Sequence, residues 1–246
     1  MDDARRFFFL HLQKTGGTAL WRRLQQHFPA TALYPGPGDG RPPTAVLSVE
    51  HLLDRWRLRR DEIRVVTGHF PLCTTELLEV PFTTLTLLRD PVERTLSYLR
   101  HHREMTPSER ERTLEDIYAD PVRFELLHNH MVKMLTLTPT EMSEGALSPV
   151  RFTPDRLERA KTRLSRIDVV GLQESFDGFC AELTARFGWE LGPPVFMNRT
   201  TPVEVSEAFR ARIAHENELD VELFEFARAL VAGRSDRSAP YNTTGI

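Results

Sequence analysis

One short segment has the composition of an anion-binding loop. It lies between an apolar run at 7–12 and an amphipathic helical pattern, and it consists of Lys14, Thr15, Gly16, Gly17, Thr18 and Ala19. Glycines let the backbone curl tightly around an anion, and a helix that begins there adds unpaired N–H groups and a favourable dipole. Lys14 adds a cation, and the threonines add hydroxyl donors. The segment predicts a cradle for a phosphate or sulfate group, whereas a plain Gly-Gly turn beside an incidental lysine is the alternative.

The loop differs from the Walker A loop of ATP- and GTP-hydrolysing proteins. That loop reads G-x-x-x-x-G-K-[ST], with the lysine late and a following hydroxyl that holds Mg²⁺. Here Lys14 comes first and the glycines follow it. A kinase or nucleotidase that uses ATP or GTP remains the main alternative, and a non-catalytic nucleotide-binding module is a third.

A second anion site is predicted where a later strand meets its helix. The strand expected at 82–88 ends at Arg89, and Asp90-Pro91 is a strong helix start. Ser97 follows Arg89 by eight residues on that helix. The Arg89 guanidinium can hold two oxygens of a phosphate, and Ser97 can add a hydroxyl. A salt-bridged arginine at an ordinary corner is the alternative for this segment taken alone.

Histidines supply the candidates for a general base. His69 follows the second predicted strand, so it is expected near Lys14 if the two strands are neighbours. His11 is expected to be a satisfied core residue, and His101 with His102 a solvated helix end that can alternatively meet an anionic acceptor. Two further residues, four apart on one expected helix, are candidates for the acceptor pocket: Asn129 and Lys133.

The elements that position these residues alternate between strands and helices. Strands are expected at 7–12, 63–67, 82–88 and 168–172, and helices at 48–60, 90–103, 108–118, 121–135, 154–165, 173–187 and 203–232. Residues 35–43 and 136–153 are expected to be loops. This order predicts an α/β fold with one P-loop-like domain, a doubly wound parallel sheet flanked by helices. Ligands then bind at the carboxyl ends of the strands.

Composition narrows the functional classes. The chain has 246 residues with 40% apolar and 27% charged side chains, and its net charge is −3. A strong basic excess is missing, so no nucleic-acid partner is expected. Cys73 and Cys180 have no disulfide or metal-ligand spacing. The apolar start is too short for a signal peptide or a membrane span, so a cytoplasmic protein is predicted, with a domain at 1–232 and a disordered tail at 233–246.

The motifs resemble those of sulfotransferases that use 3′-phosphoadenosine-5′-phosphosulfate (PAPS). The Lys-Thr-Gly-Gly-Thr loop at 14–18 resembles their 5′-phosphosulfate loop, and Arg89 to Ser97 is similar to their 3′-phosphate segment, R-x-P-x-x-R-x-x-S. Gly171 to Phe176 and Asn198-Arg199-Thr200 resemble, more weakly, a strand–helix junction and a C-terminal loop of the glycan-modifying branch, which includes heparan sulfate 2-O-sulfotransferases.

The resemblance implies PAPS as donor, 3′-phosphoadenosine 5′-phosphate (PAP) as product, and no metal. It implies that His69 is the catalytic base and that Lys14 stabilises charge on the departing phosphate. It also implies that Arg199 lies near the 3′-phosphate. The branch favours a carbohydrate hydroxyl as acceptor, but the acidic net charge argues mildly against a long polyanionic glycan. A small glycan, a lipid-linked sugar or a natural product is therefore equally open.

Overall fold

A computed structural model of the chain describes residues 5–142, 145–193 and 204–238, and side chains up to residue 234. Within this part, five strands form one sheet in the order β2-β3-β1-β4-β5, and every pairing is parallel. The strands are β1 (Phe7–Leu10), β2 (Leu33–Tyr34), β3 (Val65–Gly68), β4 (Thr83–Leu88) and β5 (Val169–Leu172). β1 is the central strand, so the loop that follows it lies in the middle of the carboxyl edge.

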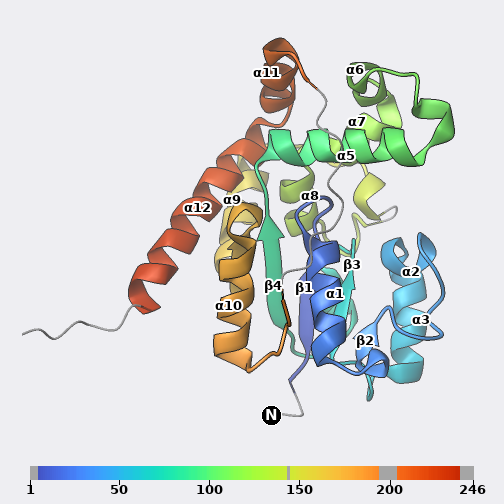
Figure 1. Cartoon of the computed structure of the whole chain (residues 1–246), viewed down its shortest axis with the longest axis vertical. Coiled ribbons are helices and arrows are strands. Elements are labelled where there is room, and N and C mark those ends of the chain that lie inside the picture. Colours follow the sequence, from blue (N-terminus) through green and yellow to red (C-terminus); the bar gives the residue numbers. More distant parts are fainter. Residues whose placement is uncertain (1–4, 143–144, 194–203, 239–246) are drawn as a thin grey trace, which may run out of the picture.

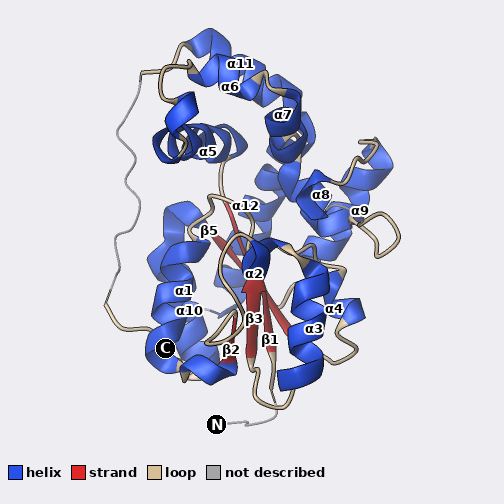
Figure 2. Cartoon of the chain, turned by 90° about the vertical axis from the view of Figure 1, so that its right-hand side faces the viewer, coloured by secondary structure: helices blue, strands red, loops and turns tan. Residues whose placement is uncertain are grey.

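Alternate residues of β1 face two different hydrophobic layers, because side chains alternate along a strand. Phe7 and Phe9 pack in one cluster with α1 (Gly17–His27) and α10 (Phe176–Phe187). Phe8 and Leu10 pack in another with α3 (Val49–Arg59), α8 (His130–Thr136), α9 (Pro154–Ser165) and α12 (Glu218–Ser238). Figure 2 shows helices on both sides of the strands. The predicted α/β class, with a doubly wound parallel sheet, is confirmed.

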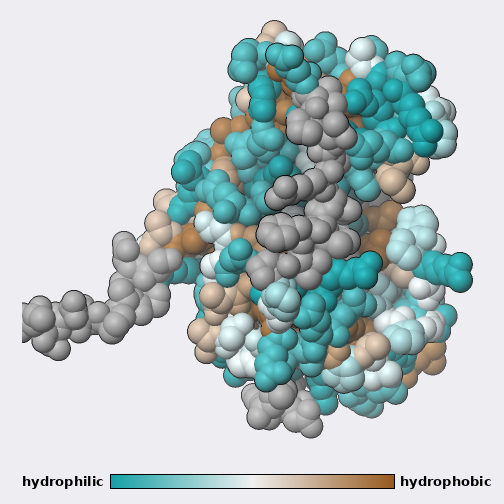
Figure 3. Space-filling view, in the orientation of Figure 1, coloured by the Kyte–Doolittle hydropathy of each residue, from teal (hydrophilic) through white to brown (hydrophobic). Residues whose placement is uncertain are grey.

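A third hydrophobic cluster lies beyond the carboxyl edge of the sheet. It joins α5 (Pro91–Met105), α6 (Leu114–Tyr118), α7 (Pro121–Leu127) and α11 (Glu207–Glu216). Figure 1 shows α5 crossing above the ends of the strands, with α6 and α11 above it. The outer surface over this layer is largely hydrophilic in Figure 3. The layer brings polar residues of α5 close to the loop after β1.

Several expected elements are confirmed with small shifts. Asp90 caps α5 by accepting a hydrogen bond from the Glu93 N–H at 2.9 Å. The helices expected at 48–60, 154–165 and 173–187 correspond to α3, α9 and α10. The expected strand at 63–67 is displaced to 65–68. Two short elements were not predicted, because neither is long enough to show a period: β2 and α2 (Thr44–Leu47). A further short helix, α4 (Thr74–Leu77), follows β3.

Some expected helices are wrong in extent. The helix expected at 121–135 is broken at Asn129, whose φ of 43° is left-handed, so α7 and α8 are separate. The helix expected at 108–118 is reduced to α6, after a 3-10 turn at Pro107–Glu109. The stretch at 203–232, expected to be helical with or without a break, is divided at Asn217 into α11 and α12.

α12 continues to Ser238, past the domain boundary expected at residue 232. Arg234 holds it against the body of the protein by donating to the Ile167 and Ser165 carbonyls at 3.1 and 2.9 Å. Residues 239–246 lie outside the described part. In the described residues no helix combines the length and apolarity needed to cross a membrane.

Candidate active site

The loop between β1 and α1 makes a sharp turn. Positive φ values at Lys14 (65°) and Gly16 (98°) turn the chain sharply before α1 begins at Gly17. Lysine adopts a left-handed φ only at a cost of about 1–2 kcal/mol, and such strain concentrates at functional sites. The first-turn amides of α1, those of Gly17 and Thr18, have no partner within the helix. These features are those expected of an anion cradle.

Two residues of the predicted cradle are used internally. The Thr15 hydroxyl is buried and donates to the Leu12 carbonyl at 2.9 Å. The Ala19 N–H donates to the Gly16 carbonyl at 3.0 Å. Both groups therefore stabilise the loop and do not offer a hydrogen to an anion. The hydrogen bonds within the described residues leave the Lys14 ammonium, the Thr18 hydroxyl and the amides of Gly16, Gly17 and Thr18 for a ligand.

The position of the His11 ring requires a glycine at residue 17. A Cβ built on Gly17 would lie 2.0 Å from the His11 ring, so any side chain must displace that imidazole. We predict that Gly17→Ala destabilises the protein by about 1–3 kcal/mol, the usual cost of overpacking. Gly178→Ala is the matched control, because a Cβ there meets nothing within 4 Å on a helix, where alanine is favoured by about 0.5–1 kcal/mol. Urea unfolding of both variants checks this, and equal stabilities would contradict it.

A buried histidine supports the loop from α8. His130 has no exposed surface, and its Nδ1–H donates to the Leu126 carbonyl at 3.1 Å. The bond leaves Nε2 as an acceptor, and it receives the Gln13 N–H at 3.4 Å. Burial, and then the Arg94 charge, hold the pKa of His130 well below its usual value, so the ring is neutral as this arrangement requires. His130 was not among the candidates predicted from the sequence, because a histidine in an apolar helix has the pattern of an ordinary core residue.

Arg89, directly after β4, contacts the loop that follows β1. Its Nη1–H donates to the Lys14 carbonyl at 3.2 Å. Burial, and then the Arg89 charge, lower the pKa of Lys14. Burial likewise lowers the pKa of Arg89, whereas the Glu93 carboxylate opposes the shift. Two partly buried cations so close together are stabilised by a bound anion, because it relieves both their repulsion and their desolvation.

Three further polar residues of α5, namely Arg94, Ser97 and His101, lie in different environments. Arg94 is fully buried, and its Nη2–H donates to the Leu127 carbonyl at 2.8 Å, so it ties α5 to the helical layer. Ser97 is partly exposed on α5. His101 lies near enough to the loop for Lys14 to lower its pKa, an effect second to that of burial. His101 is therefore a basic residue near the cradle, where a solvated helix end was expected.

His69 is oriented by the backbone that leads into the loop. It follows β3, which pairs with β1, so the predicted neighbourhood of the two strands is confirmed. Its Nδ1–H donates to the His11 carbonyl at 2.8 Å, because a carbonyl can only accept. Nε2 is then the unprotonated nitrogen, with its lone pair available for a proton. Burial lowers the pKa of His69, the His11 hydrogen bond opposes this, and the Lys14 charge adds to it.

His11 is a neighbour of His69, with ring centroids 4.4 Å apart. It is partly exposed and stacks on Phe9 at 5.4 Å, so the expectation of a satisfied core residue is wrong. Burial, and then the charges of His69 and Lys14, hold its pKa well below the usual value. Gly68 leaves room for the Phe70 ring, which a Cβ would approach to 2.2 Å.

The two acceptor candidates, Asn129 directly before α8 and Lys133 within it, have partners elsewhere in the fold. Asn129 is buried, and its Oδ1 accepts the Asp220 N–H at 3.0 Å. Lys133 is fully buried, pairs with Glu125, and donates to the Glu125 carbonyl at 2.8 Å. Both residues join α8 to its neighbouring elements, so their polar groups are already satisfied and the acceptor assignment is corrected. Arg199 lies outside the described residues, as do Asn198 and Thr200.

Within the described residues, no group of three His, Cys, Asp or Glu side chains is arranged to hold a metal ion. The independence from metal remains a prediction.

Comparison with known proteins gives limited information. No protein-family model matches the chain, and no curated protein matches it. Among solved structures, the chain is similar to a sulfotransferase from Alicyclobacillus acidocaldarius, with 19% identity over 89% of this chain and 96% of that one. The TM-score is 0.41, a similarity too low to establish a shared function.

Proposed function

We propose that the protein is a sulfotransferase that moves the sulfuryl group of PAPS to an acceptor hydroxyl. The observation that carries the proposal is the meeting of Lys14, Arg89 and His69 around one loop. The loop and the Arg89 segment carry the two motifs that resemble the phosphate sites of PAPS-dependent enzymes. A nucleotide with phosphates at both the 5′ and 3′ positions requires two such sites side by side. The Arg89–Lys14 contact supports this juxtaposition.

The groups divide the chemistry between them. The acceptor oxygen forms a bond to sulfur while the bond from sulfur to the phosphate oxygen breaks, and PAP departs with the electrons of that bond. His69 Nε2 takes the acceptor proton. Lys14 and the first amides of α1 stabilise the negative charge that grows on the departing phosphate. His11 and His130 act as positioning residues, through the His69 ring and the Gln13 amide respectively.

A kinase or nucleotidase is less well supported. The lysine precedes the glycines, and the Thr15 hydroxyl, the first one after Lys14, is engaged with Leu12. In a Walker site a hydroxyl at the end of the loop holds Mg²⁺. The geometry of the present loop offers a cation and amides in its place.

A thermal-shift screen separates the two functions. We predict that PAP raises the melting temperature in the presence of EDTA, because Lys14, Arg89 and backbone amides are its ligands. ATP and GTP should raise it less, with or without Mg²⁺, since neither carries a 3′-phosphate. A shift that requires Mg²⁺ and is larger for ATP or GTP than for PAP would support the kinase instead.

A further inference from the structure

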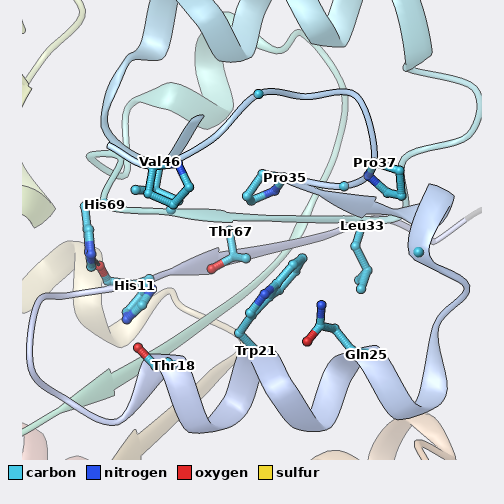
Figure 4. Close-up of a pocket in the computed structure, with 15 residues that line it drawn as sticks. His11, Thr18, Trp21, Gln25, Leu33, Pro35, Pro37, Val46, Thr67 and His69 are labelled. Carbon is cyan, nitrogen blue, oxygen red and sulfur yellow. Dashed lines mark hydrogen bonds between the residues drawn. The ribbon is translucent and has the colours of Figure 1, made fainter. Parts of the chain in front are cut away.

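A cavity of about 530 Å³ opens beside His69, at the end of β3. One wall is α1, which contributes Thr18, Trp21 and Gln25. The other wall is the proline- and glycine-rich loop after β2, and the floor is β3. Figure 4 shows the Trp21 ring between the helix and this loop, with His11 and His69 together at one end. The volume is within the range of small-molecule sites.

The wall formed by the loop is fixed in place. Asp39 is fully buried, and its Oδ2 pairs with Arg59 of α3 and accepts the Gly36 N–H at 2.8 Å. The Asp39 carbonyl accepts a hydrogen bond from His51 Nε2 at 2.6 Å. The loop is therefore a preformed part of the cavity and does not need to order around a ligand.

The lining of the cavity is mostly apolar. Among the described residues that line it, none is Lys, Arg, Asp or Glu, and the apolar ones are Trp21, Ala30, Leu33, Pro35, Pro37, Pro42 and Val46. A polyanion finds no countercharge in this lining. The polar side chains of the lining are Thr18, Gln25, Thr67 and the two histidines, so hydroxyls of a polyol that face the apolar wall stay unsatisfied, which is costly.

One polar group in the cavity lacks a partner. Thr67 is 3% exposed, and its Oγ1 has no hydrogen-bond partner among the described residues. It lies on the floor of the cavity, between Trp21 and the two histidines in Figure 4. Buried hydroxyls are nearly always hydrogen-bonded in folded proteins, so an orphan that faces a cavity indicates a ligand that completes it.

The order of the strands assigns this cavity to the acceptor. β4 carries Arg89 on one side of β1, and β3 carries His69 on the other. A donor held by Arg89 and the loop occupies the β4 side. The second reactant then approaches from the β3 side, with its hydroxyl at His69.

On the basis of the proposed function, we infer that the acceptor is a small, uncharged ring alcohol or phenol. Its apolar ring lies against Trp21, its reacting hydroxyl meets His69, and a second hydrogen-bonding group meets Thr67 Oγ1. The inference replaces the carbohydrate acceptor that the sequence motifs favoured.

The test uses radiolabelled PAPS and defined probes: 2-naphthol, its 2,6- and 2,7-dihydroxy analogues, methyl glucoside and an N-sulfated heparan tetrasaccharide. We expect transfer to the naphthols and little to the last two. After kcat/KM is divided by the number of hydroxyl groups on each probe, the better diol should exceed 2-naphthol by about 2–10-fold, the effect of one hydrogen bond. Thr67→Val, which keeps the shape of the side chain, should abolish that excess. Trp21→Ala should raise KM for both naphthols by about 3–10-fold.

Controls separate this inference from the proposed function. PAP binding by calorimetry should be unchanged in Thr67→Val and Trp21→Ala, and Thr83→Val, at the opposite end of the sheet, should keep the preference for the diol. Preferential transfer to the glucoside or the tetrasaccharide, no transfer to any naphthol by a protein that binds PAP, or a diol preference that survives Thr67→Val, would overturn the inference alone. Failure of the wild-type protein to bind PAP would overturn both.

Discussion

Replacing His69 by alanine is expected to lower the rate of sulfuryl transfer by about 10²–10⁴-fold while leaving the affinity for PAP nearly unchanged. The imidazole is held by the His11 carbonyl with Nε2 unprotonated, so it is arranged to take a proton from the acceptor. It lies on the cavity side of the loop and contacts no group that the nucleotide uses in this account. Transfer from radiolabelled PAPS and PAP calorimetry, made on the same preparations, measure the two quantities.

The pH profile gives the same variant a second readout. A base must be neutral, so the rate falls as the pH drops through the pKa of His69. Burial is the chief cause that lowers the pKa of His69, and hence the acid limb of kcat/KM should lie at a lower pH than the titration of a free imidazole. His69→Ala should remove this limb. Near-normal turnover in His69→Ala would move the base to another residue, with His101 as the next candidate, and joint loss of fold and PAP binding would make His69 structural.

Arg89→Ala and Lys14→Ala are expected to damage the nucleotide site in different ways. In the proposed complex Arg89 provides charge-assisted bonds to the 3′-phosphate, so its loss should weaken PAP by about 1.5–3 kcal/mol per bond, roughly 10–150-fold, with little effect on AMP. Lys14 contacts the 5′ group in the same proposal, so its loss should weaken both nucleotides and also slow transfer. Calorimetry on the two variants gives the affinities.

A lysine at position 89 is the matched control for Arg89. Arg89→Lys keeps the charge but loses the two-pronged geometry, so it should restore only part of the PAP affinity. Equal loss of PAP and AMP affinity in Arg89→Ala would contradict the assignment of Arg89 to the 3′-phosphate.

The positions of Lys14 and Arg89 could be predicted from the sequence, because the signals that place them are local in the chain. Lys14 and Arg89 each follow a strand directly, and parallel strands bring their carboxyl ends to one edge. The Asp90-Pro91 start of α5 is equally local, since a cap and a proline act on their own helix.

The cavity beside His69 was not predictable, because three distant segments form it. Trp21, Thr67 and the loop after β2 meet only through the strand order and through the Asp39–Arg59 pair. Asn129 and Lys133 were placed on one helix facing the site. The left-handed Asn129 breaks that helix. Its partners lie about 90 residues away in the chain, at Asn217 between α11 and α12 and at Asp220 on α12. Contacts of this kind leave no periodic signal.

The central claim is that one nucleotide with phosphates at both its 5′ and 3′ positions spans the loop after β1 and the end of β4. The most direct test is calorimetric titration of the wild-type protein with PAP and with AMP, which differ only in the 3′-phosphate. The account predicts that PAP binds at least about tenfold more tightly, the effect of one charge-assisted hydrogen bond. Equal affinity for PAP and AMP would contradict it.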